Sequence, residues 1–375
     1  MAEFKFGKLR IDDRNFEHRS APIQTKLGSQ ESPTVPTSHP GPSDLRGLQQ
    51  RGPAGESPPT GLCPPIPPPG GHATNNRFLF LREIGGPGCL NAFLENVTKL
   101  SLDPKNDDHP LVRGTLIIDQ TVKLAAPITI PPRYVLAGVG QNGRGLIQVV
   151  GSFGSQPAIR LLHPFSTLRD IDIEGGGINS GALGIDQNQD GHIYLQNVRV
   201  SGFAQYGLKA RDVASVFIDK CQFDSNQNNM LLFGTPAFGI QSWRIRDSHI
   251  RAAFEWGIRT QGPGTDFLVE GCRFEANRSG AIRLGKEFKG AVIVGNRFEN
   301  NRTPDEIGKG VAGRSVRVDP GATSTRILCN FMEGDVLVPT VPAVPKDGQG
   351  ANQATQIGFN VSDTLNDAKF RAPGF

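Results

Sequence analysis

The sequence predicts an all-β protein, a single-stranded right-handed parallel β-helix of about 8–10 coils that follows a Pro-rich N-terminal segment. Glycine contributes 46 and proline 29 of the 375 residues. Each interior glycine costs an α-helix about 1 kcal/mol relative to alanine, so this composition argues against a helical bundle. Hydrophobic residues make up only 37% of the chain, and no stretch approaches the ~20 apolar residues of a membrane span. Short strand-like units also recur at intervals that fit one coil each.

Residues 1–20 form a short segment in which apolar and basic residues are mixed. The apolar residues are Phe4, Phe6, Leu9 and Ile11. A peptide of this kind can add as a strand to the sheet edge of another protein, so we expect a docking peptide for a protein partner. An unused terminal tail is the alternative that composition leaves open.

Residues 21–74 are predicted to form a disordered linker rich in proline, glycine and serine. Thirteen of the 29 prolines lie between residues 21 and 71. A segment of this composition cannot bury enough apolar surface to offset the entropy lost on ordering. The linker therefore separates the first 20 residues from the globular part of the chain, either as a tether or as an extended terminus.

Charge, cysteine count and the N-terminal sequence narrow the choice of partners and location. Forty basic and 36 acidic residues give a net charge of +4, which is too small to predict nucleic-acid binding. The five cysteines form no CxxC pair, so neither a zinc site nor a disulfide framework is favoured. The chain begins MAEFKFGKLRIDDR, without an apolar core. We therefore expect no secretory signal peptide, synthesis in the cytoplasm and no membrane insertion.

Residues 75–375 are predicted to form the β-helix domain, which begins with one amphipathic α-helix over residues 89–101. The apolar side chains of this segment fall on one helical stripe, formed by Leu90, Phe93, Leu94, Val97 and Leu100. Glycine and proline at residues 85–88 predict a sharp start for the helix.

A four-residue strand pattern, apolar at alternate positions, recurs from residue 170 onward. The units end at Ile173, Val200, Phe223, Ile250, Phe274, Phe298, Phe331 and Val361, with spacings of 27, 23, 27, 24, 24, 33 and 30 residues. Two further apolar runs lie within each unit, so each repeat supplies three short strands. This pattern favours one coil per repeat, with insertions at residues 299–315 and 333–356.

Stacked coils place equivalent residues about 4.8 Å apart along the axis, so the repeat predicts columns of like side chains. One inward column is expected to contain Val198, Cys221, Ser248, Cys272, Asn296 and Cys329. An aromatic core column is expected from Phe223, Phe274, Phe298 and Phe331. A hydrogen-bonded turn ladder is expected from Asn226, Asn277 and Asn301.

Residues 114–143 read GTLIIDQTVKLAAPITIPPRYVLAGVGQNG. Together with the repeats, they resemble the pectin-lyase-like superfamily, which includes pectate lyases, polygalacturonase-related proteins and phage tail spikes. The resemblance implies that the helix at residues 89–101 caps the N-terminal end of the coil and protects an open sheet edge. It is weak evidence for activity, because one fold hosts many functions. The paired aspartates of polygalacturonases and the arginine motif of pectate lyases have no counterpart in this sequence.

Two glutamates on adjacent coils are the first candidates for catalysis. Glu275 and Glu299 occupy equivalent positions in two RFE units. Their expected separation of about 5 Å is close to that of the carboxylates in retaining glycosidases. The alternative is a surface lattice of ion pairs with the neighbouring arginines, in which each contact contributes little.

A column of basic residues on the second strand of each coil is the candidate for carbohydrate binding. Interrupted by Leu232, it contains Lys209, Arg259, Arg283 and Arg317. Tyr206 and Trp256 precede it, so their rings are expected to stack on sugars while the basic groups bind carboxylates. Glu255, next to Trp256, is a further candidate acid or base. The alternative is a solvated basic face that the two aromatic residues cover.

Residues 186–191 match the first half of a calcium-binding loop. Oxygen ligands at alternate positions would come from Asp186, Asn188 and Asp190. The twelfth position is Asn197 instead of the bidentate glutamate, so a plain polar turn is the alternative. Apart from this Ca²⁺ site we expect no cofactor.

The sequence favours a structural or glycan-binding β-helix, such as a spike or fibre component of a phage-like particle anchored through residues 1–20. An extracellular or virion-like location would follow, and since spikes of this fold are often trimers, a homotrimer is the expected assembly. The alternative is a polysaccharide lyase, glycoside hydrolase or epimerase that acts on an acidic polysaccharide with an unfamiliar site.

Overall fold

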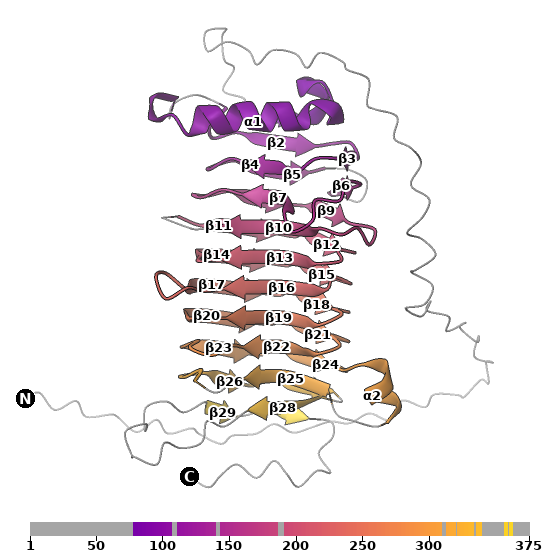
Figure 1. Cartoon of the computed structure of the whole chain (residues 1–375), viewed down its shortest axis with the longest axis vertical. Coiled ribbons are helices and arrows are strands. Elements are labelled where there is room, and N and C mark those ends of the chain that lie inside the picture. Colours follow the sequence, from indigo (N-terminus) through magenta and orange to yellow (C-terminus); the bar gives the residue numbers. More distant parts are fainter. Residues whose placement is uncertain are drawn as a thin grey trace, which may run out of the picture. The chain divides into compact units, whose positions relative to one another are not determined.

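The computed structural model describes residues 78–106, 111–139, 143–186, 191–309, 313–319, 321–333, 335–339, 356–358 and 360–362. The predicted docking peptide (1–20) and linker (21–74) lie outside the described residues. The described part of the chain forms a column of stacked strands with a helix at its N-terminal end (Figure 1).

Three parallel sheets, named A, B and C, run along this column. Sheet A contains β1 (Phe78–Phe80), β2 (Thr115–Ile118), β5 (Val135–Gly138), β8 (Thr167–Arg169), β11 (Ile193–Gln196), β14 (Ala214–Asp219), β17 (Ile240–Arg246), β20 (Gly264–Glu270), β23 (Ala291–Val294), β26 (Arg326–Leu328) and β29 (Gln356–Gly358). Sheet B contains β3 (Val122–Leu124), β6 (Gly145–Val149), β9 (Ile171–Glu174), β12 (Arg199–Ser201), β15 (Gln222–Asp224), β18 (His249–Arg251), β21 (Arg273–Glu275), β24 (Arg297–Glu299), β27 (Phe331–Glu333) and β30 (Val361–Ser362). Sheet C contains β4 (Ile128–Ile130), β7 (Pro157–Leu161), β10 (Gly181–Asp186), β13 (Tyr206–Arg211), β16 (Asn228–Phe233), β19 (Trp256–Gln261), β22 (Gly280–Leu284), β25 (Gly313–Val318) and β28 (Asp335–Pro339).

Each coil contributes one strand to each sheet. Among the described residues, nine complete coils run from β2 to β28, and β29 and β30 begin a tenth. Adjacent coils pair in parallel, so that Phe274 faces Phe298 and Glu275 faces Glu299. The register shifts within the β25–β28 pair, between Arg314 and Arg317. The β-helix predicted from the repeat is confirmed, and the coil number lies within the predicted range.

The interior of the column is a continuous apolar core, because alternate residues of each strand point inward. In β13, Leu208 and Ala210 are buried, whereas Lys209 between them is partly exposed. Phe274 and Phe298 stack across adjacent coils with ring centroids 5.1 Å apart. Part of the phenylalanine excess of the sequence is therefore explained by this inward column.

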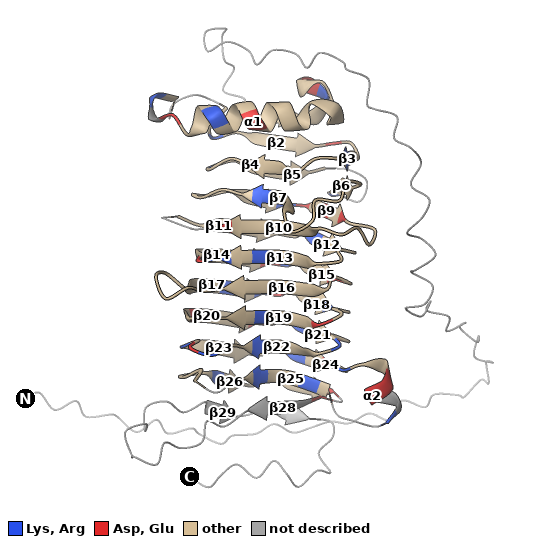
Figure 2. Ribbon diagram, in the orientation of Figure 1, with Lys and Arg blue, Asp and Glu red and all other residues tan. Residues whose placement is uncertain are grey.

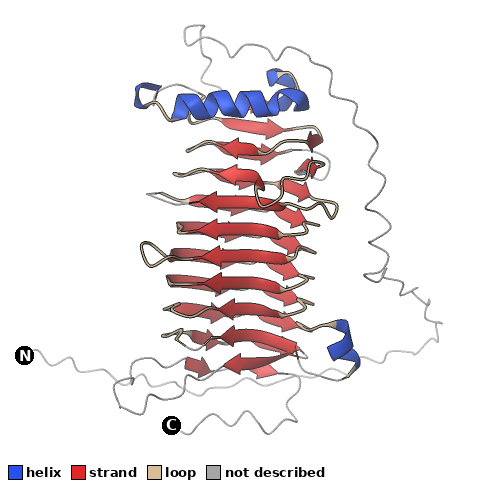
Figure 3. Ribbon diagram, in the orientation of Figure 1, coloured by secondary structure: helices blue, strands red, loops and turns tan. Residues whose placement is uncertain are grey.

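Helix α1 (Leu90–Ser101) closes the N-terminal end of the core, as predicted for residues 89–101. It buries Leu90, Phe93, Leu94 and Val97 and lies across the first coil (Figure 3). Three short 3-10 turns accompany it: η2 (Leu81–Ile84), η3 (Pro87–Cys89) and η4 (Pro104–Asn106). None of the described helices is long and apolar enough to cross a membrane.

Two ladders of buried amides tie the coils together along the axis. In the predicted ladder, the side-chain amide of Asn277 donates to Oδ1 of Asn301 at 2.7 Å. The backbone N–H of Asn301 donates in turn to Oδ1 of Asp335 at 2.8 Å. A second ladder, which the sequence did not predict, joins Asn296 to Asn330 at 3.0 Å and Asn330 to Asn360 at 2.9 Å. Both ladders satisfy turn amides that would otherwise be buried without a partner.

The register of β27 differs from the prediction by one residue. Phe298 pairs with Met332, which is fully buried, and Phe331 is instead 40% exposed. Asn330, not Cys329, continues the inward column, because Asn330 accepts the amide bonds of Asn296. A shift of one residue moves every side chain of a strand to the opposite face, so Phe331 and Cys329 leave the columns predicted for them.

The cysteines differ in their environments. Cys221 and Cys272 are free and buried, as predicted for core residues, whereas Cys329 is free and exposed. Cys89 is disulfide-bonded, so the odd cysteine count does not exclude a bridge. The insertion predicted at residues 299–315 contains α2 (Pro304–Gly308), and most of the one predicted at 333–356 lies outside the described residues.

Candidate functional site

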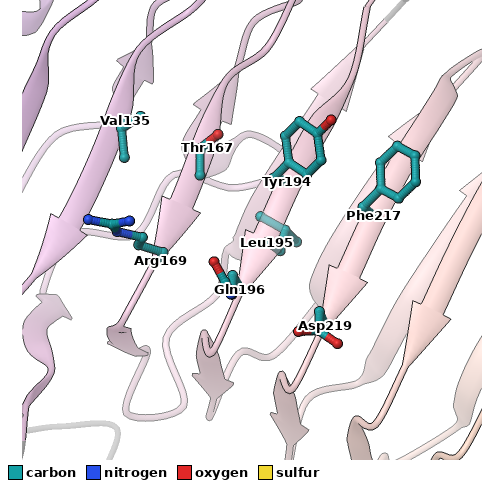
Figure 4. Close-up of a pocket in the computed structure, with 8 residues that line it drawn as sticks. All are labelled: Val135, Thr167, Arg169, Tyr194, Leu195, Gln196, Phe217 and Asp219. Carbon is teal, nitrogen blue, oxygen red and sulfur yellow. The ribbon is translucent and has the colours of Figure 1, made fainter.

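A pocket of about 330 Å³ lies on the outward face of sheet A, over strands β5, β8, β11 and β14. Figure 4 shows two rows of side chains that cross these strands: Val135, Thr167, Tyr194 and Phe217 in one, and Arg169, Gln196 and Asp219 in the other. The rows arise from strand register, since Thr167 pairs with Tyr194 and Tyr194 pairs with Phe217. The first row is mainly apolar and aromatic, and the second is polar.

The aromatic row presents an exposed pair of stacked rings. Tyr194 and Phe217 have ring centroids 5.2 Å apart and an interplanar angle of 17°. His192 packs edge-on against both rings, and Phe165 packs edge-on against His192. The side chain of Tyr194 is 37% exposed, so part of this supported aromatic surface remains open to a ligand.

The polar row places hydrogen-bonding groups beside these rings. Gln196 pairs with Arg169 on one side and with Asp219 on the other. Within the part of the chain that the structure describes, the carboxylate of Asp219 and the side-chain amide of Gln196 have no hydrogen-bond or ion-pair partner. Arg169 lies 3.9 Å from the carboxylate of its neighbour Asp170. The row therefore offers a free acceptor, a free amide and a guanidinium to a bound molecule.

The sequence interpretation missed this pocket, although a signal for it was present. HIYL (192–195) and SVFI (215–218) are equivalent apolar runs of consecutive coils, and both carry an aromatic residue at the third position. Because the side chains of a strand alternate between its two faces, Tyr194 and Phe217 were predictable as an outward column.

The predicted basic column lies on the outward face of sheet C, where Figure 2 shows basic residues on β7, β13, β19, β22 and β25. Arg259 pairs with Arg283, and Arg283 pairs with Arg317. Lys209 pairs with Leu231, not with the predicted Leu232, which is buried. Gly184 separates Lys209 from Arg160, a basic residue of the same column that the sequence interpretation missed.

The aromatic residues expected to stack on sugars beside this column are buried. Tyr206 is 4% exposed and Trp256 is 6% exposed. The ring of Tyr206 lies over Gly181, and the ring of Trp256 lies over Gly280, at the places where a side chain would otherwise stand. Glycines on the neighbouring strands leave room for both rings, so in this structure neither ring presents an open face beside the basic column.

The three candidate glutamates are held as hydrogen-bond and ion-pair acceptors. Glu255 accepts from the amides of Gln227 and Asn228, at 2.9 Å each. Glu275 lies 3.0 Å from Nε2 of His249 and 3.3 Å from Nη2 of Arg273.

Glu299 also accepts from Arg273, at 2.8 Å. The register of sheet B places Glu275 and Glu299 on adjacent strands as expected. Their surroundings match the ion-pair lattice, the second of the two arrangements considered for these residues.

The predicted calcium loop lies mostly outside the described residues. Asp186 is described, exposed and 3.8 Å from Arg160, whereas Asn188 and Asp190 are not described. The described residues contain no group of three or more His, Cys, Asp and Glu side chains that could hold a metal ion.

Residues 166–325 match the family model for a right handed beta helix region. No curated protein matches the chain.

Several solved structures are similar to the chain. Geobacillus virus E2 ORF18 is 14% identical, with a TM-score of 0.34 over 60% of this chain, which spans 45% of that protein. DFA-IIIase from Arthrobacter chlorophenolicus A6 without its lid is 12% identical, with a TM-score of 0.43 over 77% of this chain and 94% of the enzyme. The Dettilon tailspike protein (gp208) is 12% identical, with a TM-score of 0.36 over 69% of this chain and 67% of that protein.

Proposed function

We propose that this protein is a glycan-binding β-helix whose saccharide site is the pocket on sheet A. The observation that carries the proposal is the exposed stack of Tyr194 on Phe217 beside the carboxylate of Asp219, which has no ion-pair partner among the residues that the structure describes. A sugar ring has apolar C–H faces and a polar rim of hydroxyl groups. The aromatic row can stack on the C–H face of a sugar ring, and the polar row beside it can hydrogen-bond the hydroxyl groups of the rim.

The charge of the pocket favours a neutral saccharide. Arg169 and Asp219 contribute one charge of each sign to the lining, and the remaining lining residues are uncharged. The carboxylate of Asp219 can accept from two sugar hydroxyls, while Arg169 and Gln196 can donate to others. A uronate placed against Asp219 would meet a like charge, which disfavours binding.

The test is direct binding of neutral oligosaccharides by calorimetry after a glycan-array screen. Tyr194→Ala and Phe217→Ala are each expected to weaken binding by up to about tenfold, since an aromatic contact contributes roughly 0.5–1.5 kcal/mol beyond its buried area. Val292→Ala, an outward residue of sheet A beyond the pocket, is the matched control and should change little. Unchanged affinity in both aromatic variants would exclude the pocket as the saccharide site.

A hydrolase or lyase remains the second candidate. The observation that favours it is the carboxylate of Asp219, which has no partner within the described part of the chain. The predicted catalytic residues Glu255, Glu275 and Glu299 are engaged by amide, arginine or histidine partners. Asp219 lines the pocket, and no described side chain pairs with its carboxylate. Turnover would appear as new reducing ends or as the ultraviolet absorbance of an unsaturated product. If the parent protein shows turnover, and Asp219→Asn binds the saccharide but no longer turns it over, Asp219 is a catalytic residue. A parent protein without turnover on these substrates would contradict the enzyme hypothesis.

Attachment to a phage-like particle through residues 1–20 remains a prediction from sequence, as does a homotrimer. Deletion of residues 1–20 is expected to abolish association with the parent particle while the β-helix keeps its melting temperature. Retained association would contradict the docking role. Light scattering of the full chain measures the oligomeric state.

A further inference from the structure

We infer that a proline run of this chain, residues 64–69, docks in the sheet A pocket of the same molecule and competes there with a saccharide. The run reads PPIPPP, and residues 70–77 separate it from β1, the first described strand. The inference concerns regulation of the pocket, and it rests on the proposed function only in the competition with a saccharide.

The chain enters the fold in line with the aromatic row of the pocket (Figure 4). Phe78, the exposed first residue of β1, pairs with Thr115, and Thr115 pairs with Val135. Val135 is the first residue of the aromatic row, and successive pairs continue from it to Phe217. The segment that precedes Phe78 therefore starts at the head of the register column that contains the exposed rings.

Residues 70–77 are long enough to bring the run over the pocket. Tyr194 lies in β11, four strand spacings from β1, which is about 19 Å at the separation of paired strands. An extended chain covers at most ~3.3–3.6 Å per residue, so the peptide units from Pro69 to Phe78 span up to about 30 Å. The run can therefore reach each strand of the pocket while the β-helix stays as it is.

The repeat of a polyproline II helix matches the spacing of the coils. The helix has three residues per turn and rises about 3.1 Å per residue. Residues three apart are therefore about 9.3 Å from one another, and alternate coils are about 9.6 Å apart. Pro65 and Pro68 can thus contact Thr167 and Phe217, which are separated by one coil. Proline-rich segments in this conformation bind aromatic-lined surfaces in other proteins.

The polar row of the pocket matches the backbone of such a helix. Polyproline II carbonyls form no internal hydrogen bonds, so they can accept from Arg169 and Gln196, which line the pocket. Ile66 is the one residue of the run with a backbone N–H, and this group can donate to the carboxylate of Asp219. Residues 57–71 carry no charged side chain, so the run brings no like charge against either charged group of the lining.

Tethering makes even a weak contact of this kind effective. A short tether gives the run an effective concentration in the mM range. A run that binds with a Kd of about 0.1–1 mM would then fill the pocket for at least about half of the time. A saccharide binds only the open fraction, so we expect its apparent affinity to fall by roughly two- to tenfold.

Photo-crosslinking in the full chain provides the first test. The photoreactive amino acid p-benzoylphenylalanine at Ile66 should crosslink to peptides that contain Tyr194 or Phe217, with a yield that does not change on dilution. The same amino acid at Ser38, which lies outside the run, is the control and should give far fewer of these crosslinks. Equal yields from both positions would overturn the inference. A yield that falls on dilution would also overturn it, because the occupant would then be a second copy.

Proline substitutions provide the second test. The test variant carries Pro64→Ser, Pro65→Ser, Pro67→Ser and Pro68→Ser. The matched control carries Pro33→Ser, Pro36→Ser, Pro40→Ser and Pro42→Ser, which lie outside the run. In calorimetry the test variant should bind a neutral oligosaccharide roughly two- to tenfold more tightly than the parent chain, and the control should bind as the parent does. Equal affinity of the two variants would contradict competition for the pocket.

The two tests separate this inference from the proposed function. If no neutral saccharide binds, the proposed function fails, and the crosslink from Ile66 alone decides whether the run docks. If Tyr194→Ala weakens saccharide binding but Ile66 gives no crosslink to the pocket, the saccharide site stands and the docking of the run is wrong. If both hold, Tyr194→Ala should lower the crosslink yield together with the saccharide affinity.

Discussion

The aromatic residues on the outward faces of sheets A and C differ in their exposure to solvent. On sheet A, Tyr194 stands against Phe217 of the next coil and is 37% exposed. On sheet C, Trp256 lies over Gly280 of the next coil and is 6% exposed. The difference lies in the neighbouring strand: a bulky residue in register supports a ring upright, whereas a glycine leaves a slot in which a ring lies flat. Exposure on a stacked coil is therefore a property of residue pairs across coils.

The two faces also differ in whether their aspartates are paired with arginines. Asp319 on sheet C is clamped by Arg283 and Arg317, while Asp219 on sheet A has no ion-pair partner among the described residues. A paired carboxylate organises the cations around it, and an unpaired one is free to meet a ligand. The same fold thus presents a saccharide-like pocket on one side and a cationic column on another.

The largest expected effect comes from truncating one aromatic residue on each face. Trp256→Ala should lower the free energy of unfolding by about 3–5 kcal/mol, because the ring is buried. Tyr194→Ala should lower it by less, about 1 kcal/mol, because Tyr194 is 37% exposed and its ring packs at the surface of the sheet. Chemical denaturation of both variants measures the difference, and equal losses would contradict the contrast between the faces.

The second prediction fills the slot beneath Trp256. A Cβ at Gly280 would stand 2.5 Å from Cζ3 of Trp256, and the backbone φ of +141° is one that L side chains rarely adopt. Gly280→Ala should therefore displace the ring and lower the free energy of unfolding by about 1–3 kcal/mol, with a red shift of tryptophan emission. Gly88→Ala, where nothing lies within 4 Å of the added Cβ, is the control and should leave the emission unchanged.

The third prediction concerns the loss of stability at low pH that the buried His163 causes. Burial and the nearby His192 lower the pKa of His163 from 6.5 to about 4. Both ring nitrogens of His163 are buried, and neither has a hydrogen-bond partner among the described residues. The unfolded chain therefore binds this proton more readily between pH 6.5 and 4, so stability is complete above pH 6.5 and falls as the pH drops toward 4. After discounting for partial exposure, we expect a loss of order 1 kcal/mol.

Melting temperatures of the parent and His163→Leu across pH 4–7 isolate this contribution. The pH dependence of the variant should be shallower, and parallel curves would assign the acid sensitivity to other groups. Because His192 packs against Tyr194 and Phe217, we expect saccharide binding on sheet A to weaken in the same pH window.

The smallest effect is expected on sheet B, which serves as the reference surface. Glu275→Gln and Glu299→Gln each remove partly exposed ion pairs, so each should change the free energy of unfolding by no more than about 0.5 kcal/mol. Neither variant should alter glycan binding or any turnover. A loss of turnover in either one would restore the glycosidase-like pair that the sequence suggested.

The predictability of the fold followed from the repeat itself. Spacings near 24 residues, three apolar runs per unit and the helix stripe at residues 89–101 each report on local periodicity, and all three were confirmed. The register of β27 was mispredicted because the alignment placed Phe331 beneath Phe298. The structure aligns Asn330 with Asn296 instead. A buried amide without a hydrogen-bond partner costs more free energy than placing Met332 in the core where Phe331 was expected.

The sequence alone determined the coil, its cap, the asparagine ladder and the column of arginines, because each depends on spacing along the chain. Tertiary structure alone decided which aromatic rings reach solvent and which carboxylates are paired. Tyr194 and Trp256 are both aromatic residues of β-strands, and Asp219 and Asp319 are both aspartates at or just beyond a strand end. Apart from Arg317, which lies two positions from Asp319, the residues that decide these roles are 23 to 36 positions away, and only the stacking of the coils brings them into contact.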